Sequence, residues 1–314
     1  MELTIGQHYT WKGLRRTVQR VCKACTTCKE AKHGAKKYGI VPPKKADVLP
    51  WHTVCIDLIG PYKIGKKDKQ VSLHCMTMID PATGWFEIAE VPSRQADDIS
   101  NILELTWLTR YPWPTEVIMD RGREFAKEVR EMIMGECGCV RKLITTRNPQ
   151  ANAMVERIHQ VIGSMINSMQ IRDADSLGPY GWQGILAALR QAVRSTVHTT
   201  TRATPTQLVF GRDAILNVGF EADWQYIKER KQHRILQNNA RENESRIVHQ
   251  YSVGDRVMVR QKPNRKYGTD KQRGPYTVTR VNEDNGTLRL TKVTYNGGAV
   301  TQTWNVRNVD PCRD

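Results

Sequence analysis

Three acidic residues occupy positions where a carboxylate is unfavourable unless it has a partner. Asp57 interrupts the apolar run 54–59, Asp120 directly follows the apolar residues 117–119, and Glu156 lies on the polar side of a segment with helical spacing. A charge inside a buried run is costly unless it is paired or bound to a metal. Each residue also has a structural interpretation: an exposed strand end for Asp57, an Asx-turn for Asp120 and a solvated helix face for Glu156.

Taken together, the three carboxylates suit metal-assisted phosphoryl transfer. Two at strand ends and one on an adjacent helix could meet at one edge of a sheet. Such a set binds two divalent ions, which stabilise the entering and leaving oxygens of an in-line displacement at phosphorus. Hard oxygen ligands favour Mg²⁺ or Mn²⁺ over zinc.

The pattern of apolar residues predicts the elements that would position these groups. Short apolar runs predict strands over 54–59, 71–79, 85–91, 116–119 and 140–145. Helical spacing predicts helices over 12–31, 95–110, 124–136, 182–197 and 225–249, and one that begins at Asn148-Pro149 and carries Glu156. From Tyr251 onward the period returns to two, which predicts a small all-β domain.

The charge distribution indicates a polyanionic partner. The chain has 314 residues, with 48 Lys and Arg against 32 Asp and Glu. Residues 1–45 carry a net charge of +9, residues 46–215 are neutral and residues 216–314 carry +7. A nucleic acid held by the basic ends and acted on by the middle would explain this distribution. Generic solubility is the alternative explanation.

The spacing of the acids resembles that of a known enzyme family. Between Asp57 and Asp120 lie 62 residues, and between Asp120 and Glu156 lie 35. This is similar to the DDE motif of retroviral and LTR-retrotransposon integrases. Four sequence stretches in the right order resemble the integrase core of gypsy-type elements: Cys55-Ile56-Asp57-Leu58-Ile59-Gly60-Pro61, Met78-Ile79-Asp80 with Thr83-Gly84-Trp85, Ile118-Met119-Asp120-Arg121-Gly122, and Asn148-Pro149-Gln150-Ala151-Asn152 with Val155-Glu156-Arg157.

The resemblance implies an α/β fold with an RNase H-like core, in which a mixed five-stranded sheet has helices on both faces. It implies DNA integration: a water attacks near the 3′ end of the element's DNA, and the freed 3′-hydroxyl then attacks target DNA. By resemblance, Asp57 would bridge two Mg²⁺ or Mn²⁺ ions, and Asp120 and Glu156 would each bind one. Four residues near Glu156 are candidates for DNA contact: Asn152, Arg157, His159 and Gln160.

Both ends of the chain also resemble integrase modules. The segment from Tyr9 to Lys32 looks like the second half of a His-His-Cys-Cys zinc module, with Cys25 and Cys28 as two zinc ligands. The two histidines of that module would lie upstream, so we expect an N-terminally truncated chain, and Cys22 with His33 is an alternative source of ligands. The stretch Gly274-Pro275-Tyr276 resembles the GPY/F module, a small barrel whose basic residues would bind phosphates: Arg260, Lys262, Lys266 and Arg273.

The expected organisation has four parts. These are a partial zinc-module segment and linker over 1–45, an RNase H-like core over 46–215, a helical connector over 216–250 and a GPY/F-like small β-barrel over 251–314. We expect DNA and further copies of the chain as partners and no membrane, because no apolar run approaches the ~18–20 residues that span a bilayer. By resemblance the location would be intracellular, and nuclear if the host is eukaryotic.

Two other functions remain open from the sequence. An inactive or domesticated copy would bind DNA through its basic ends without chemistry. An RNase H-type hydrolase would need a fourth carboxylate, for which Asp80 is the near candidate, although its Asp-Pro-Ala-Thr-Gly context predicts a turn.

Overall fold

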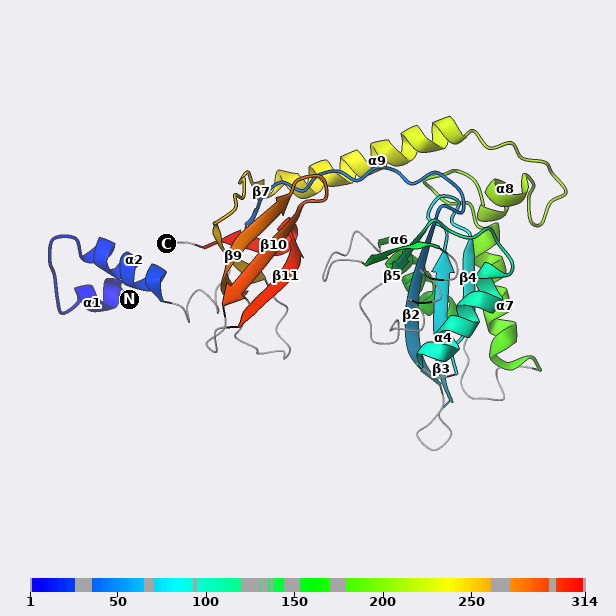
Figure 1. Ribbon diagram of the computed structural model, residues 1–314, viewed down its shortest axis with the longest axis horizontal. Coiled ribbons are helices and arrows are strands. Elements are labelled where there is room, and N and C mark those ends of the chain that lie inside the picture. Colours follow the sequence, from blue (N-terminus) through cyan, green and yellow to red (C-terminus); the bar gives the residue numbers. More distant parts are fainter. Residues whose placement is uncertain are drawn as a thin grey trace. The chain divides into compact units, whose positions relative to one another are not determined.

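The computed structural model divides the chain into two compact units (Figure 1). Residues 45–235 form one unit, here called the core unit, and residues 1–44 with 236–314 form the other, the terminal unit. The structure describes residues 2–25, 36–64, 71–92, 95–119, 131, 135, 138–143, 153–169, 179–260, 272–293 and 298–312. The four domain boundaries expected from the sequence stay a prediction.

The core unit contains a mixed five-stranded sheet in the order β4-β3-β2-β5-β6. Its strands are β2 (Thr53–Ile64), β3 (Val71–Ile79), β4 (Phe86–Glu90), β5 (Glu116–Met119) and β6 (Val140–Leu143). Strands β2, β3 and β4 pair antiparallel, whereas β5 pairs parallel with β2 and with β6. The five predicted strands correspond to these elements, and β2 continues further than predicted, past a register shift between Ile59 and Tyr62.

Alternation along the strands gives the sheet two apolar faces. Val54 and Ile56 contribute to one buried cluster, while Cys55 and Ile59 contribute to another on the opposite face. Because β2 is buried on both sides, helices must cover both faces of the sheet.

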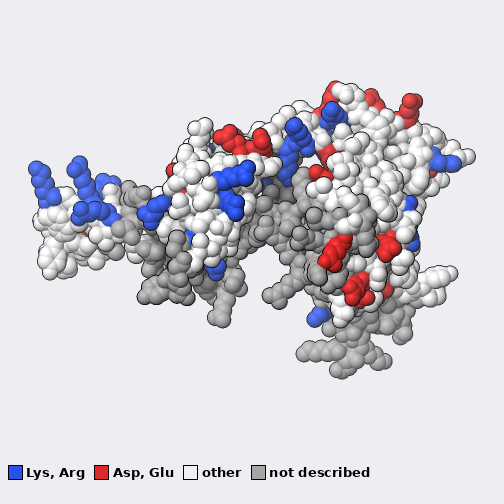
Figure 2. Space-filling view, in the orientation of Figure 1, with Lys and Arg blue, Asp and Glu red and all other residues white. Residues whose placement is uncertain are grey.

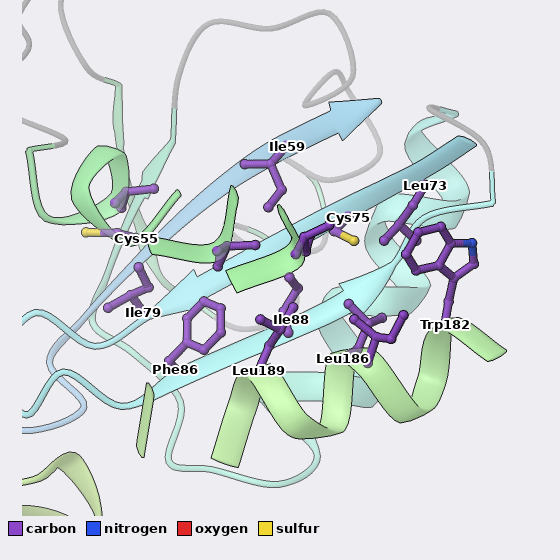
Figure 3. Packing of buried hydrophobic residues seen from close by; sticks show 14 residues of the cluster. Cys55, Ile59, Leu73, Cys75, Ile79, Phe86, Ile88, Trp182, Leu186 and Leu189 are labelled. Atoms are coloured by element: carbon purple, nitrogen blue, oxygen red, sulfur yellow. The ribbon is translucent and has the colours of Figure 1, made fainter. Parts of the chain in front are cut away.

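Different helices complete the two clusters. The first face is covered by α4 (Ala96–Leu103) and the π-helical turn η2 (Glu104–Leu108), through the buried side chains of Ile99, Leu103 and Trp107. The second face is covered by α6 (Ala153–Ser168) and α7 (Gly181–Ser195). Figure 3 shows Leu186 and Leu189 of α7 packed against strand residues of that second cluster. This mixed sheet with helices on both faces fits the RNase H-like core that the sequence predicted.

Most of the predicted helices correspond to helices of the structure, but the one expected over 225–249 is too long, because the structure ends it at Glu244 and forms strand β7 (Arg246–Ile247) directly after it. The helix expected over 95–110 is α4 followed without a break by η2, and the chain leaves the helical conformation before Pro112. The helix expected over 124–136 lies outside the described residues except for residues 131 and 135.

Two further helices follow the core sheet. Helix α8 (Pro205–Phe210) begins with a capping box, in which Thr204 accepts from the Gln207 N–H and Gln207 accepts from the Thr204 N–H. Helix α9 (Trp224–Glu244) corresponds to the predicted polar helix, although its Lys231 is buried.

The terminal unit is built on a five-stranded antiparallel sheet in the order β11-β10-β9-β8-β12. Its strands are β8 (Arg256–Arg260), β9 (Gln272–Asn282), β10 (Thr287–Val293), β11 (Ala299–Asn305) and β12 (Val309–Pro311), and the turn η7 (Val306–Asn308) precedes β12. Buried Val257, Val278 and Leu290 lie in its apolar core. Within the described part of this unit the pairings leave β11 and β12 at the two edges, so closure into a barrel stays a prediction.

Short elements complete the terminal unit. Strand β1 (Lys37–Tyr38) lies in the stretch expected to be a linker and pairs parallel with β7 (Arg246–Ile247). Helices α1 (Glu2–Gly6) and α2 (Leu14–Ala24) precede it, and α2 covers the described part of the predicted helix over 12–31. Among the described residues, no helix is both long enough and apolar enough to cross a lipid bilayer.

Candidate active site

Asp57 lies in the middle of β2 with its side chain on the face covered by α6 and α7. It has the same strand parity as Cys55 and Ile59, which belong to the cluster on that face. Its carboxylate is 23% exposed, and the N–H of Leu58 donates to Oδ1 at 2.9 Å. The sequence placed this carboxylate in a buried run, and the structure leaves it accessible at the side of the sheet that faces α6.

Thr77 and His159 surround Asp57. Thr77 is the strand partner of Asp57 on β3, is fully buried, and donates its hydroxyl to the main-chain oxygen of Asp57 at 3.1 Å. His159 of α6 has Nε2 at 2.9 Å from the Thr77 hydroxyl oxygen and Nδ1 at 3.9 Å from Asp57 Oδ2. Thr77 was not found from the sequence, because cross-strand register cannot be derived from an apolar pattern alone.

The contact between His159 and Asp57 is not an ion pair at neutral pH. Burial lowers the pKa of His159 from 6.5 to about 4, so its imidazole is neutral at pH 7. The distance of 3.9 Å is also too long for a hydrogen bond. At neutral pH His159 is therefore an uncharged ring held by its hydrogen bond to Thr77.

Glu156 lies in the first turn of α6 with its side chain exposed. It precedes His159 by three residues, so the two side chains share one side of the helix. Val155 and Ile162 of the same helix are buried in the cluster against the sheet. Helix α6 thus packs against the sheet through its apolar side, and Glu156 lies one turn before His159, the residue that contacts Asp57.

Asp120 lies outside the described residues, but the strand that leads to it is described. Strand β5 ends at Met119, and its parallel register with β2 places Ile118 beside Cys55. Both paired residues lie two positions before an aspartate in the sequence, and both contact the cluster on the α6 face. The described part of β5 therefore runs in register with β2, so that the positions two residues before Asp57 and Asp120 lie side by side.

The other residues near Glu156 differ in accessibility. Arg157 and Gln160 are exposed on α6, whereas His159 is partly buried. Asn152 lies outside the described residues.

Among the basic residues expected to bind phosphate in the terminal unit, Arg260 forms a salt bridge with Asp310. Its guanidinium donates to both carboxylate oxygens of Asp310 at 2.8 Å, and also to the main-chain oxygen of Lys36. Arg273 is exposed, and Lys262 and Lys266 lie outside the described residues.

Two exposed arginines that the sequence did not single out lie on the β9–β10 part of the same sheet. Arg280 of β9 and Arg289 of β10 are direct cross-strand partners. Like charges at such positions repel each other. The sequences of β9, β10 and β11 contain no Asp or Glu, which was a sequence pattern that could have revealed this surface. Figure 2 shows basic side chains on the visible face of this unit.

Asp80 holds the turn after β3 together through its hydrogen bonds. It is fully buried at the turn after β3, where it accepts from the N–H groups of Ala82 and Trp51 and from the Thr83 hydroxyl. Burial raises the pKa of its carboxyl group. These contacts match the turn predicted from its sequence context.

Of the two expected zinc ligands, Cys25 is partly buried just after α2, and Cys28 lies outside the described residues. No cluster of three or more His, Cys, Asp or Glu side chains suitable for a metal is formed within the described ranges. That finding does not include Asp120.

Comparisons with known proteins agree with the motifs. Residues 1–34 match the family described as "Integrase zinc binding domain". The Transposon Tf2-3 and Tf2-4 polyproteins of Schizosaccharomyces pombe are each 23% identical to this chain over 211 residues, which are 65% of the chain and 15% of each polyprotein. The chain therefore spans a small part of the curated relatives that it matches.

A solved structure shares the fold. It is the cryoEM structure of the simian T-cell lymphotropic virus intasome in complex with PP2A regulatory subunit B56 gamma, with a TM-score of 0.58 and 12% identity. The match covers 99% of this chain and 94% of that one. The resemblance to LTR-retrotransposon integrases inferred from the motifs is confirmed.

Proposed function

We propose that this chain is a divalent-metal-dependent polynucleotidyl transferase that integrates retroelement DNA into target DNA. It would process the 3′ ends of the element and then join them to the target. The observation that carries this proposal is the placement of Asp57 on the sheet face covered by α6, the helix whose first turn contains Glu156.

The residues at this site fit Mg²⁺ or Mn²⁺. Asp57 and Glu156 supply hard oxygen donors that are accessible to solvent, and Asp120 would supply a third. When bound, the ions would offset negative charge on the phosphate and on the entering and leaving oxygens. The protein's own task is to hold the carboxylates and to position the DNA strands, because the reaction needs no covalent enzyme intermediate.

DNA would be held by exposed basic and polar side chains in both units. In the core unit, Arg157 and Gln160 lie on α6 beside Glu156. In the terminal unit, the acid-free strands β9 to β11 present Arg273, Arg280 and Arg289. Phosphates placed between opposed arginines would relieve the repulsion between them, which supports this surface as a backbone-binding site.

Three further parts of the proposal concern zinc, assembly and location. Cys25 and Cys28 are proposed as thiolate ligands of a structural zinc, supported by the family match of residues 1–34. Cys22 and His33 are candidates for the remaining positions. We further propose that the chain acts as a homo-oligomer and, in a eukaryotic host, in the nucleus.

A strand-joining assay tests the catalytic proposal. The 314-residue chain would be mixed with a labelled DNA duplex, unlabelled plasmid and MnCl₂, and covalent transfer of label to the plasmid would be measured. We expect joining by the wild type, none above background by Asp120→Asn or Glu156→Gln, and unchanged DNA binding by fluorescence anisotropy for all three. Asp97→Asn is the matched control, because Asp97 is an exposed acid on α4, which covers the opposite face of the sheet.

The other outcomes identify the alternatives. Joining by Asp120→Asn would refute the catalytic assignment. DNA binding without joining by the wild type would support the DNA-binding protein without chemistry. Cleavage of an RNA–DNA hybrid instead of joining would support the hydrolase.

A further inference from the structure

Two hydrogen bonds connect the main chain of Asp57 to the helix that carries Glu156. Thr77 has one hydroxyl proton, and it donates that proton to the main-chain oxygen of Asp57 at 3.1 Å. Its second bond, to His159 Nε2 at 2.9 Å, therefore requires the nitrogen to donate and the hydroxyl oxygen to accept. The direction of both bonds follows from this proton count.

The two hydrogen bonds link positions next to the two acids, Asp57 and Glu156. At one end they reach residue 57 itself, and at the other they reach a side chain one helical turn after Glu156. The apolar contacts of Val155 and Ile162 hold α6 on the sheet, but apolar packing tolerates small sliding and rotation of a helix. Directional hydrogen bonds at one turn restrict that freedom.

We propose that Thr77 and His159 form a tether that fixes Glu156 relative to Asp57, so that His159 is a positioning residue of the metal site. This inference rests on the function proposed above. It replaces the DNA contact that the sequence suggested for His159 with a role inside the protein.

The accessibility of the neighbouring residues supports this role. The side chain of His159 is 18% exposed, and its Nε2 is already bonded to a residue that is fully buried. Arg157 and Gln160, by contrast, are exposed on the same helix. The neighbours are therefore better placed than His159 to reach a DNA strand.

Removing either hydrogen bond should lower the affinity for the metal while the variant remains folded. Partners that orient metal ligands typically contribute ~10- to 100-fold to metal affinity. We expect the dissociation constant for Mn²⁺ to rise about tenfold in Thr77→Val, which keeps the shape of the side chain but removes the hydroxyl group. His159→Phe keeps a ring but removes the donor, and should give a similar loss.

The experiment measures Mn²⁺ binding to the full chain, without DNA, by the loss of the electron paramagnetic resonance signal of free Mn²⁺. Thr77→Ser and His159→Gln retain a hydroxyl and a donor, respectively, and should restore most of the affinity. Ser164→Ala, an exposed change on the same helix, is the matched control and should bind Mn²⁺ like the wild type. Circular dichroism and thermal unfolding without metal would show whether each variant is folded.

A double variant separates a tether from two independent effects. If Thr77 and His159 act as one unit, the double variant that combines Thr77→Val and His159→Phe should bind Mn²⁺ with about the same affinity as whichever single variant binds it less tightly. Independent contributions would multiply to a loss of about a hundredfold, and that result would overturn the tether.

The remaining outcomes are also decisive. Folded single variants that bind Mn²⁺ like the wild type would overturn the tether while the proposed function stands. A His159→Phe variant that loses DNA affinity but keeps Mn²⁺ affinity would return His159 to the DNA-contact role. An Asp57→Asn variant that binds Mn²⁺ as tightly as the wild type would instead refute the metal site itself.

Discussion

Replacing the buried Lys231 with Met should destabilise the core unit, because three carbonyl oxygens would lose a charged donor. Lys231 Nζ donates to the main-chain oxygens of Asp47, Pro81 and Ala82 at 3.0, 2.9 and 2.6 Å. The side chain is 8% exposed, and the negative charges of Asp80 and Asp47 favour its protonated form. Methionine preserves most of the aliphatic volume, so the change tests the ammonium group.

The expected magnitude is the difference between two opposing effects. A hydrogen bond from a charged donor contributes ~1.5–3 kcal/mol, and three are removed. Against this, burial lowers the pKa of Lys231 from 10.5 to about 8, which corresponds to a cost of about 3 kcal/mol for keeping the ammonium charged. The three bonds together contribute ~4.5–9 kcal/mol, so the balance is a loss of ~1.5–6 kcal/mol in the free energy of unfolding, or roughly 3–24 °C in Tm for a unit of this size.

The assay is urea unfolding of the full chain followed by tryptophan fluorescence. Six of the eight tryptophans lie within residues 45–235, so the signal reports mainly on the core unit. Lys228→Met is the matched control, because Lys228 is exposed on the same helix, and we expect it to change stability by less than ~0.5 kcal/mol. A Lys231→Met variant whose core unfolds at the same urea concentration as the wild type would show that the three hydrogen bonds of Lys231 contribute no net stability.

The pH dependence of stability, compared between the wild type and Lys231→Met, tests whether burial lowers the pKa of Lys231. The pKa of Lys231 is lower in the folded state, so between about pH 8 and 10.5 the unfolded chain binds more protons than the folded chain. Stability contributed by this residue is therefore smallest below pH 8 and increases as the pH rises through that window. The stability difference between wild type and Lys231→Met should widen from pH 8 to 10, and a difference that narrows would contradict the lowered pKa.

Two further changes test the DNA surface and the core. Replacing Arg280 and Arg289 with Gln should weaken DNA binding and reduce the slope of log affinity against log salt by ~0.9 for each phosphate that the protein no longer neutralises, as measured by anisotropy at several salt concentrations. An unchanged slope would exclude this surface from DNA binding. Leu186→Ala removes a fully buried side chain from the cluster under α6 and α7, and should cost ~2–5 kcal/mol in urea unfolding. A loss below ~1 kcal/mol would show that this cluster is less tightly packed than the structure indicates.

The strands of the core could be predicted because burial imposes a local pattern. The runs at 54–59, 71–79 and 116–119 are apolar on both sheet faces, and each corresponds to a strand of the structure. The predicted strand ends at Ile59, directly before Gly60 and Pro61, two residues that weaken regular strand pairing. In the structure, β2 pairs again with β3 after a register shift.

The candidate site could be predicted only in part, since its supporting contacts depend on long-range register. Asp57 and Glu156 were found from local sequence patterns. Asp57 is a carboxylate within an apolar run, and Glu156 belongs to a polar stripe with helical spacing. Thr77 was missed, because nothing local distinguishes it from any other strand threonine. The engagement of Arg260 by Asp310 was missed for the same reason, as the two residues are 50 positions apart. The assignment of Arg260 to DNA stays a prediction.

Anomalous X-ray scattering from Mn²⁺ in crystals of the full chain would test the shared metal site most directly. We expect strong anomalous density in contact with the carboxylates of Asp57, Asp120 and Glu156, and its loss from Asp57→Asn crystals grown in the same conditions. Carboxylates too far apart to share an ion, with no anomalous density between them, would rule out a metal site shared by the three acids.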